Sequence, residues 1–226
     1  MSRVRALIIA NAAGRARGQL QRLARSAQLI IAADGGADAA ARAGVRPHLL
    51  VGDMDSIGRG RRARLTRAGV EMRTVPAAKD LTDTQLALQI ARQRGATDVT
   101  LAAALGGRAD HALANLLLPL LAHRMGVRLT LVAGRTEVRL ADGRVELDGA
   151  VGDLVSLIPL SVVVEGVTTF GLRYPLVAER LVRGETRGIS NVITAVPAGL
   201  ERPGSGDLLV VHTRRRLSRA SRQTKA

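Results

Sequence analysis

The chain has 226 residues, enough to bury a core in one large domain or two small ones. It has no cysteine, which excludes disulfides and thiolate metal sites, and only one Tyr, one Phe and no Trp. Its 34 basic and 19 acidic residues give a net charge of +15. Because the basic residues are scattered without aromatic neighbours, apart from the tail 214–226, we expect attraction of anionic small molecules rather than nucleic-acid binding.

Apolar stretches that could enter a membrane are short in this sequence. None approaches the ~20 residues of a membrane span, and the longest run, 112–122, contains Pro119. The apolar run at 6–10 is too short for the core of a signal peptide. We therefore expect a cytoplasmic protein without a membrane partner.

Residues 1–135 alternate short β-branched runs with longer amphipathic runs rich in alanine and arginine. This alternation predicts a parallel sheet covered by helices on both faces, a three-layer α/β domain. Right-handed crossovers place the carboxyl ends of such strands on one edge, where these sheets bind ligands. Strands are expected at 4–10, 29–33, 49–52, 70–75, 98–104 and 128–133. Helices are expected near 15–26, 35–43, 58–68, 82–94 and 109–125.

The pattern changes at residue 136, after which short apolar runs are separated by Gly, Asp or Pro. No helical period survives there, and "ADGR" at 141–144 indicates a hairpin between two alternating strands. Residues 136–226 are therefore expected to form a small antiparallel β-sandwich domain. The predicted fold class is α/β, with the parallel-sheet domain first and the sandwich second.

Four polar clusters follow predicted strands of the first domain. In the first, "AADGGAD" at 32–38, Gly35 and Gly36 open a helix whose free N–H groups suit phosphate. Taken alone, this cluster is explained more simply by Asp34 capping the helix. Four clusters on one edge of a sheet nevertheless favour a binding site over four independent caps.

The second cluster, "GDMDS" at 52–56, ends a buried strand on two carboxylates. Residues two apart in extended backbone point the same way, so Asp53 and Asp55 should converge. Like charges at close range raise each other's pKa unless a cation lies between them. Mg²⁺ is such a cation, since it uses one or two carboxylates together with substrate phosphates. Capping by Asp55 or Ser56 explains one carboxylate but not both.

The third and fourth clusters add further charged side chains at the starts of helices. "AAKDLTDTQLAL" at 77–88 offers two carboxylates three residues apart beside a lysine, and Thr82 or Asp83 could cap the helix that follows. "ALGGRADHALANLLL" at 104–118 again reads as strand, double glycine and helix, and offers Arg108, Asp110, His111 and Asn115. Carboxylates, guanidinium groups and glycine-rich turns suit metal-assisted phosphoryl chemistry. The phosphate-loop, dinucleotide-binding and serine-hydrolase motifs are absent from the sequence.

These motifs resemble those of the thiamine pyrophosphokinases (thiamine diphosphokinases). "ADGGAD", "GDMDS", "KDLTDTQLAL" and "GGRADHALAN" occur in that family's order and spacing, and "VTTFGLRYPL" at 167–176 and "GISN" at 188–191 resemble its thiamine-side motifs. The resemblance covers roughly 4–212. It departs at Tyr174, where the family often has Trp, and at "RGISN", where a Ser-Thr-Ser-Asn form is common.

The resemblance implies an ATP- and Mg²⁺-binding catalytic domain at 1–135, a thiamine-binding domain at 136–226, and a homodimer. It implies transfer of diphosphate from ATP to the hydroxyl of thiamine, giving thiamine diphosphate and AMP. The expected catalytic residues are Asp53, Asp55, Asp83, Arg108 and Asp110. The expected Mg²⁺ ligands are Asp53, Asp55, Asp80 and Asp83. The residues expected to bind ATP are Asn11, Asp34, Gly35, Gly36, Lys79, Thr82, Gly107 and Asn115. Those expected to bind thiamine are Phe170, Tyr174, Ser190 and Asn191.

Several alternatives stay open on the sequence. Asp110 and Asp55 are candidates for the proton acceptor, and the two aromatic rings could bind the cationic thiazolium or fill the sandwich core. A diphosphokinase for another heteroaromatic alcohol, such as a pterin, has the same signature. A non-catalytic sensor of nucleotide or thiamine diphosphate is a further reading, although so many carboxylates favour catalysis.

Overall fold

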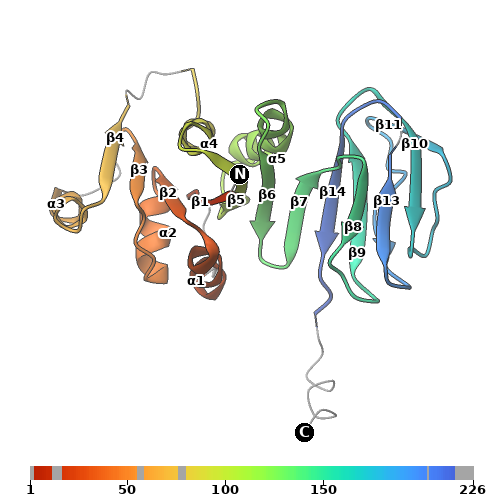
Figure 1. Cartoon of the computed structure of the whole chain (residues 1–226), viewed down its shortest axis with the longest axis horizontal. Coiled ribbons are helices and arrows are strands. Elements are labelled where there is room, and N and C mark those ends of the chain that lie inside the picture. Colours follow the sequence, from red (N-terminus) through yellow and green to blue (C-terminus); the bar gives the residue numbers. More distant parts are fainter. Residues whose placement is uncertain (1–2, 12–16, 55–58, 76–79, 203, 217–226) are drawn as a thin grey trace, which may run out of the picture. The chain divides into compact units, whose positions relative to one another are not determined.

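The structure, a computed structural model, describes residues 3–11, 17–54, 59–75, 80–202 and 204–216. The chain divides into two compact units, Met1–Gly134 and Arg135–Ala226. The first unit contains the helices and the parallel strands, and the second is built from antiparallel strands (Figure 1). The α/β fold class expected from the sequence is confirmed.

The first unit contains a six-stranded sheet in the order β6-β5-β1-β2-β3-β4, in which every neighbouring pair is parallel. From β1 the chain steps outward to β4, and then returns to the other side of β1 for β5. The order therefore reverses between β1 and β5, the kind of switch point at which open α/β sheets bind ligands. The strands are β1 (Val4–Ile9), β2 (Leu29–Ala33), β3 (Leu49–Gly52), β4 (Glu71–Thr74), β5 (Ala96–Ala102) and β6 (Arg128–Ala133).

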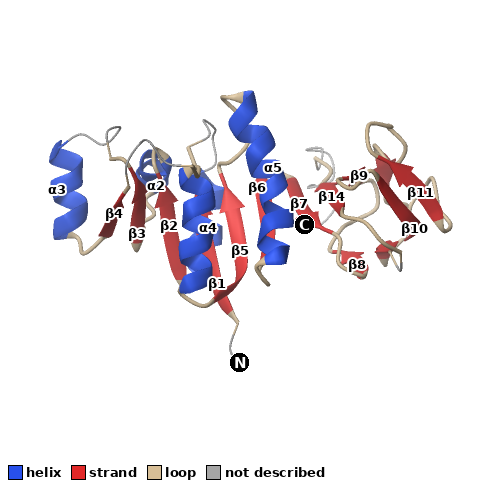
Figure 2. Ribbon diagram, turned by 90° about the horizontal axis from the view of Figure 1, so that it is seen from above, coloured by secondary structure: helices blue, strands red, loops and turns tan. Residues whose placement is uncertain are grey.

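Helices cover both faces of this sheet (Figure 2). The first two pack on β1 and β2, and α4 and α5 lie on the opposite face. The second helix approaches the sheet closely because it buries only small side chains, at Gly36, Ala37, Ala39, Ala40 and Ala43. The helices are α1 (Arg17–Ser26), α2 (Gly36–Ala43), α3 (Arg59–Arg67), α4 (Asp83–Gln93) and α5 (Ala109–Arg124).

The second unit is a sandwich of two antiparallel sheets, as expected. Within it, β12-β9-β14-β7 are neighbours in one sheet, and β11-β10-β13-β8 form the other. Inward-facing Val, Leu and Ile side chains from both sheets make one core, which includes Leu157, Val164 and Leu200. The strands are β7 (Thr136–Leu140), β8 (Arg144–Leu147), β9 (Leu154–Pro159), β10 (Val163–Phe170), β11 (Glu179–Val182), β12 (Asn191–Val192), β13 (Ala198–Glu201) and β14 (Leu208–Thr213).

The hairpin predicted at 141–144 is wrong. Its turn exists, and Gly143 adopts a left-handed conformation with φ of 61°. However, β7 pairs with β14 while β8 pairs with β13, so the turn leads from one sheet to the other. The strands on either side of the turn find partners more than 50 residues away.

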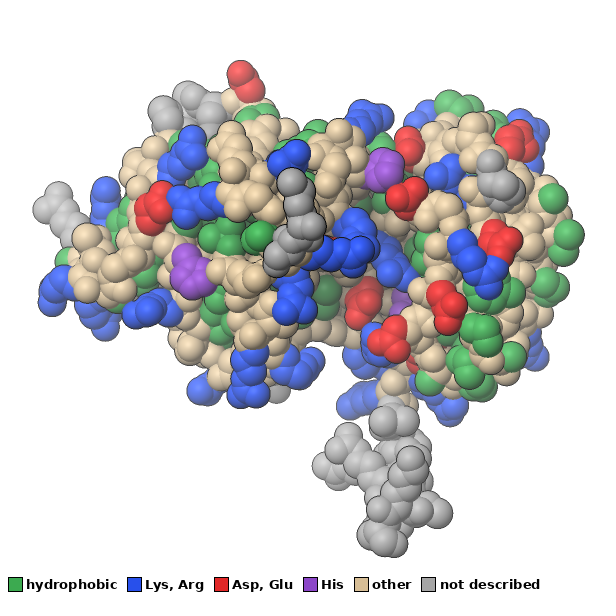
Figure 3. Space-filling view, in the orientation of Figure 1, with side chains coloured by type: hydrophobic (Ala, Val, Ile, Leu, Met, Phe, Trp, Pro, Cys, Tyr) green, Lys and Arg blue, Asp and Glu red, His purple; other side chains and the backbone are tan. Residues whose placement is uncertain are grey.

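No helix among the described residues is long and apolar enough to cross a membrane. On the face drawn in Figure 3, Lys and Arg side chains lie over many elements with acidic side chains among them. This agrees with basic residues that are scattered along the sequence rather than collected in one stripe.

Candidate active site

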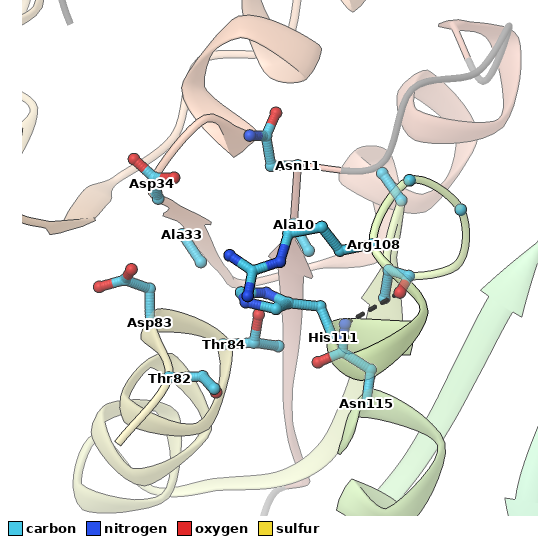
Figure 4. Close-up of a pocket in the computed structure, with 14 residues that line it drawn as sticks. Ala10, Asn11, Ala33, Asp34, Thr82, Asp83, Thr84, Arg108, His111 and Asn115 are labelled. Atoms are coloured by element: carbon cyan, nitrogen blue, oxygen red, sulfur yellow. Dashed lines mark hydrogen bonds between the residues drawn. The ribbon is translucent and has the colours of Figure 1, made fainter. Parts of the chain in front are cut away.

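A cavity of about 380 Å³ lies at the carboxyl edge of the parallel sheet. Its walls include Ala10, which follows β1, and Ala103 and Ala104, which follow β5, so it lies at the switch point of the sheet (Figure 4). The polar side chains that line it are Asn11, Asp34, Thr82, Asp83, Thr84, Arg108, His111 and Asn115. The loops after β1, β2 and β5, and the starts of α4 and α5, therefore bring several predicted residues together.

Asp34 enters the cavity from a tight turn at the end of β2. Its backbone adopts a positive φ of 47°, and its N–H donates to the carbonyl of Val51 on the neighbouring strand at 2.7 Å. The carbonyl of Asp34 accepts from the N–H of Ala37, which starts the helical turn. Gly35, not Asp34, is the N-cap of α2, and no side chain caps this helix. The capping explanation for Asp34 is therefore wrong, and Asp34 lines the cavity.

The two glycines after Asp34 allow the turn to pack closely on β1. A Cβ added at Gly36 would lie 2.0 Å from the carbonyl oxygen of Ile9, and one at Gly35 would lie 2.3 Å from Cγ of Asn11. A side chain at either position would displace the turn or Asn11. Both glycines therefore have a packing role on the protein side of the turn, whether or not their backbone also meets a ligand.

The start of α4 forms another part of the cavity wall. Thr82 is the N-cap, and its Oγ1 accepts from the N–H of Gln85 at 3.2 Å. This confirms one of the two capping residues considered for this helix. Asp83, in the first turn, and buried Thr84 then line the cavity. Carboxylates at a helix start are favoured by the positive end of the helix dipole.

The first turns of α5 present Arg108, His111 and Asn115 to the cavity. Spacings of three and four residues place side chains on one face of a helix. Asn115 is buried, and its Nδ2 donates to the carbonyl of Ala104 at 2.9 Å, which ties α5 to the loop after β5 (Figure 4). In Figure 4 the Arg108 guanidinium and the His111 ring extend toward the cavity from one side, with Asp34 and Asp83 on the other.

His111 and Thr84 line the cavity but were not among the residues expected to act there. The position of His111, three residues after Arg108 and four before Asn115, could have shown from the sequence that His111 shares a helix face with them. Asp110, which was expected, lies on a different face of α5 and does not line the cavity among the described residues.

Asp110 is paired with Arg108 instead. Nη2 of Arg108 donates to Oδ2 of Asp110 at 2.6 Å, and Nε donates to Oδ1 at 3.2 Å. These hydrogen bonds, helped by the backbone N–H of His111, lower the pKa of Asp110 to about 2. A carboxylate with so low a pKa accepts a proton poorly at neutral pH. The structure therefore argues against Asp110 as the proton acceptor.

The predicted metal ligands are only partly gathered. Asp83 lines the cavity, whereas Asp80 is exposed and outside it. Asp53 is half-buried, and the Gly52 backbone before it passes close to Asp34, where an added Cβ would lie 3.2 Å from Cα of Asp34. Within the described residues, no group of three acidic or histidine side chains could hold an ion.

Two predicted site residues, Asp55 and Lys79, lie outside the described residues, so the carboxylate pair of "GDMDS" stays a prediction. Gly107, predicted beside the nucleotide, lines the cavity with a φ of 73°.

In the second unit, Asn191 fixes the backbone that carries Tyr174. Nδ2 of Asn191 donates to the carbonyl of Tyr174 at 2.6 Å, and Oδ1 accepts from the N–H of Tyr174 at 3.0 Å. The Asn191 amide is buried, while 61% of Tyr174 is exposed. Ser190 is also exposed, and its backbone N–H donates to Oγ of Ser156. Asn191 thus holds the loop that carries Tyr174, whereas the Ser190 backbone is bonded to β9.

The second aromatic residue, Phe170, is half-buried and is absent from the sandwich core. The guanidinium of Arg144 lies 4.4 Å from its ring centroid, and a Cβ added at Gly199 would lie 2.8 Å from its Cζ. One face of the ring therefore already has a cationic partner within the protein. By contrast, the guanidinium of Arg173 lies farther from the Tyr174 ring, at 5.8 Å.

Comparison with known proteins identifies the family. The family model for the thiamin pyrophosphokinase catalytic domain matches residues 20–131, and that for the thiamin pyrophosphokinase vitamin B1 binding domain matches residues 144–198. Thiamine pyrophosphokinase from Bacillus subtilis is 30% identical over 151 residues, which cover 66% of this chain and 71% of that protein.

Solved structures show the same fold. A crystal structure of thiamine pyrophosphokinase from B. subtilis aligns with a TM-score of 0.80 and 24% identity, covering 93% of this chain and 99% of the other. A thiamin pyrophosphokinase family protein from Enterococcus faecalis aligns with a TM-score of 0.76 and 27% identity, covering 95% and 100%. The chain therefore belongs to the thiamine pyrophosphokinase family.

Proposed function

We propose that this protein transfers a diphosphate group from ATP to the hydroxyl of thiamine, giving thiamine diphosphate and AMP in a Mg²⁺-dependent reaction. The main support from the structure is one cavity that combines the carboxylates of Asp34 and Asp83 with the guanidinium of Arg108. This combination suits a metal-bound polyphosphate, and family membership supports thiamine as the acceptor.

We assign ATP and Mg²⁺ to the first unit. The carboxylates on the cavity wall fit Mg²⁺ in kind and number, because this ion binds through one or two carboxylates and takes further oxygens from substrate phosphates. Asp34 and Asp83 would hold it, with Asp53 on the next strand end as a further candidate. When bound, Mg²⁺ would neutralise negative charge on the phosphates.

The side chains of the chain have separate tasks in this proposal. Arg108 offers a guanidinium to the phosphate oxygens, and its partner Asp110 keeps that side chain in one orientation. Asn115 holds the loop after β5 through Ala104, so that Gly107 can bring backbone close to the nucleotide. His111 is a further polar group within the same cavity.

We assign thiamine to the second unit, where the exposed ring of Tyr174 offers a face to the cationic thiazolium or the pyrimidine. Asn191 serves this contact by positioning the Tyr174 backbone, and Ser190 offers an exposed hydroxyl next to it. Phe170 has a weaker claim to ligand contact, because Arg144 already covers its ring.

We further propose a homodimer, and a cytoplasmic location is retained as a prediction. Exposed apolar side chains support self-association: Leu113 and Leu117 lie one turn apart on α5, and Leu154 and Ile158 lie on the outer side of β9. Light scattering coupled to gel filtration tests the dimer, and a mass of one chain at micromolar concentration would contradict it.

The test of the reaction is AMP release from Mg-ATP in the presence of thiamine. Asp83→Asn should lower kcat/KM about 100-fold or more, because it removes several kcal/mol of charge stabilisation around the phosphates. Asp142→Asn, at an exposed turn of the second unit, is the matched control and should retain activity. AMP release with a pterin alcohol but not with thiamine would show that the diphosphate acceptor is the pterin. Binding of nucleotide or thiamine diphosphate without any AMP release would show that the protein is a sensor and not an enzyme.

A further inference from the structure

The first unit has a second cavity, also of about 380 Å³, at the amino end of its central strands. It is lined by residues that begin β1, β5 and β6 and by the last turn of α1. Asp98 in this cavity and Ala104 in the candidate active site are six residues apart along one strand and its loop, which corresponds to roughly 20 Å at about 3.3 Å per residue. The nearest lining residues on this strand, Thr100 and Ala103, are three residues or about 10 Å apart. A molecule bound here would not occupy the candidate active site.

Strand register explains which side chains meet in this cavity. Arg5 on β1 lies beside Asp98 on β5, which lies beside Arg128 on β6. Partners in a parallel register point to the same side of a sheet, so these three form a charged row across three strands. One step along the strands, Thr100 lies beside Thr130 and adds two hydroxyl groups to the same face.

The charges in this row do not balance. Asp98 accepts from Nε of Arg128 at 2.8 Å and also from its Nη2, so this carboxylate is committed to Arg128. Arg3 and Arg5 line the cavity too, and neither side chain forms an ion pair with any residue that the structure describes. Three guanidinium groups and one carboxylate leave two positive charges around one cavity.

The polar lining is also rich in donors. Arginine side chains only donate hydrogen bonds, and threonine hydroxyls can donate. Ser26 is the exception, since its hydroxyl already donates to the carbonyl of Leu23 at 3.0 Å. Apart from Asp98, the lining therefore favours a ligand that accepts hydrogen bonds and carries about two negative charges. Phosphate has both properties, and guanidinium groups bind it through paired donors.

We infer that this second cavity is a binding site for a phosphate-class dianion, either inorganic phosphate or diphosphate or the phosphate of a nucleotide. Arg3 and Arg5 supply the uncompensated charge, Arg128 is held in place by Asp98, and Thr100 and Thr130 donate neutral hydrogen bonds. The inference is independent of the proposed function, because it concerns residues at the other end of the sheet.

The experiment is calorimetric titration of the full chain with inorganic phosphate, diphosphate and AMP in turn. The double variant R3Q/R5Q should bind at least one of these anions about 100-fold more weakly, because it removes two guanidinium groups and each lost charge-assisted hydrogen bond is worth roughly a tenfold change in affinity. T100V, which changes no charge, should weaken the same anion about threefold. If phosphate and diphosphate bind, the ligand is the free anion, whereas selective binding of AMP assigns it to a nucleotide.

Two controls separate this cavity from the candidate active site and from general charge effects. R108Q alters the active-site cavity and should leave the affinity that depends on Arg5 unchanged. R62Q/R64Q removes the same charge from exposed positions of α3 and should leave affinity within about twofold. The inference is overturned if R3Q/R5Q binds every anion as the wild type does, or if R62Q/R64Q loses as much. Thermal unfolding of each variant confirms that these surface changes leave the protein folded.

Discussion

The two units hold their candidate functional residues in different ways. In the first, Asp34 and Asp83 are placed by the ends of adjacent elements, where the backbone of one turn bonds to the next strand and glycines allow close contact. In the second, the loop that carries Tyr174 depends on one buried side-chain amide, that of Asn191. A site made by sheet topology follows from local sequence patterns, whereas a loop held by one distant residue does not.

The largest expected effect tests the backbone-built site. Gly36→Ala would place a Cβ 2.0 Å from the carbonyl oxygen of Ile9, so it should destabilise the fold by about 3 kcal/mol or more. Gly18→Ala, in α1 with no atom within 4 Å, is the matched control and should be neutral or stabilising by up to about 1 kcal/mol. Urea unfolding measures both variants. Equal stability of the two would show that the turn at Gly36 yields easily.

Asn191→Ala tests the loop held by a side chain. It leaves the N–H and carbonyl of Tyr174 without their partner, which should lower the free energy of unfolding by about 1–3 kcal/mol. Hydrogen exchange at the Tyr174 amide should accelerate. The Leu176 amide, which donates to Oγ1 of Thr169, is the internal control and should keep its protection. Unchanged exchange at Tyr174 would remove the positioning role.

Tyr174→Ala tests what that loop presents. Loss of a ring that faces a cationic ligand should raise the KM for thiamine about tenfold, because a cation–π contact contributes roughly 0.5–2 kcal/mol. The KM for ATP should stay the same, and Tyr174→Phe, which keeps the ring, should stay close to the wild type. Equal changes in both KM values would assign Tyr174 a structural role instead.

The smallest effect concerns the exposed pair of Arg108 and Asp110. Since the pKa of Asp110 in the folded protein is lowered to about 2, its contribution to stability is present above its unfolded value near 4 and is lost as pH falls toward 2. The melting temperatures of Asp110→Asn and the wild type should therefore differ by no more than about 2 °C at pH 7 and converge near pH 2. Between pH 5 and 9 the shape of the pH–rate profile should not change. If the pH–rate profile of Asp110→Asn loses its acidic limb in that range, Asp110 is again a candidate for the proton acceptor.

Much of the first unit could be predicted from sequence, because its strands, apart from β1 with β5, pair with the next strand along the chain through a helical crossover. The strand at 29–33 and the helix expected near 35–43 are found at Leu29–Ala33 and Gly36–Ala43. Asp110 as a catalytic residue stays a prediction, and it does not line the cavity within the part of the chain that the structure describes. A residue type at one position does not show which face of α5 the side chain occupies. Helical spacing separates Asp110 from His111 once the helix start is known.

The second unit was predictable in class but not in pairing. The turn at 141–144 reads as a hairpin, and only the distant partners β14 and β13 draw its flanking strands into different sheets. Likewise, Asn191 lies 17 residues from Tyr174, so the hydrogen bonds between them exist only in the folded sandwich. Local patterns carry no information on such partners.

Tyr174 is the chain's single tyrosine, there is no tryptophan, and 61% of the residue is exposed. With excitation at wavelengths that phenylalanine does not absorb, ultraviolet emission from this protein therefore arises from one chromophore on one loop. Quenching upon ligand addition would report stacking at that loop without any label, and a nucleotide confined to the first unit would leave the signal unchanged. Unfolding of the parallel sheet does not change this tyrosine emission. Different melting temperatures from emission and from circular dichroism would therefore show that the two units unfold at different temperatures.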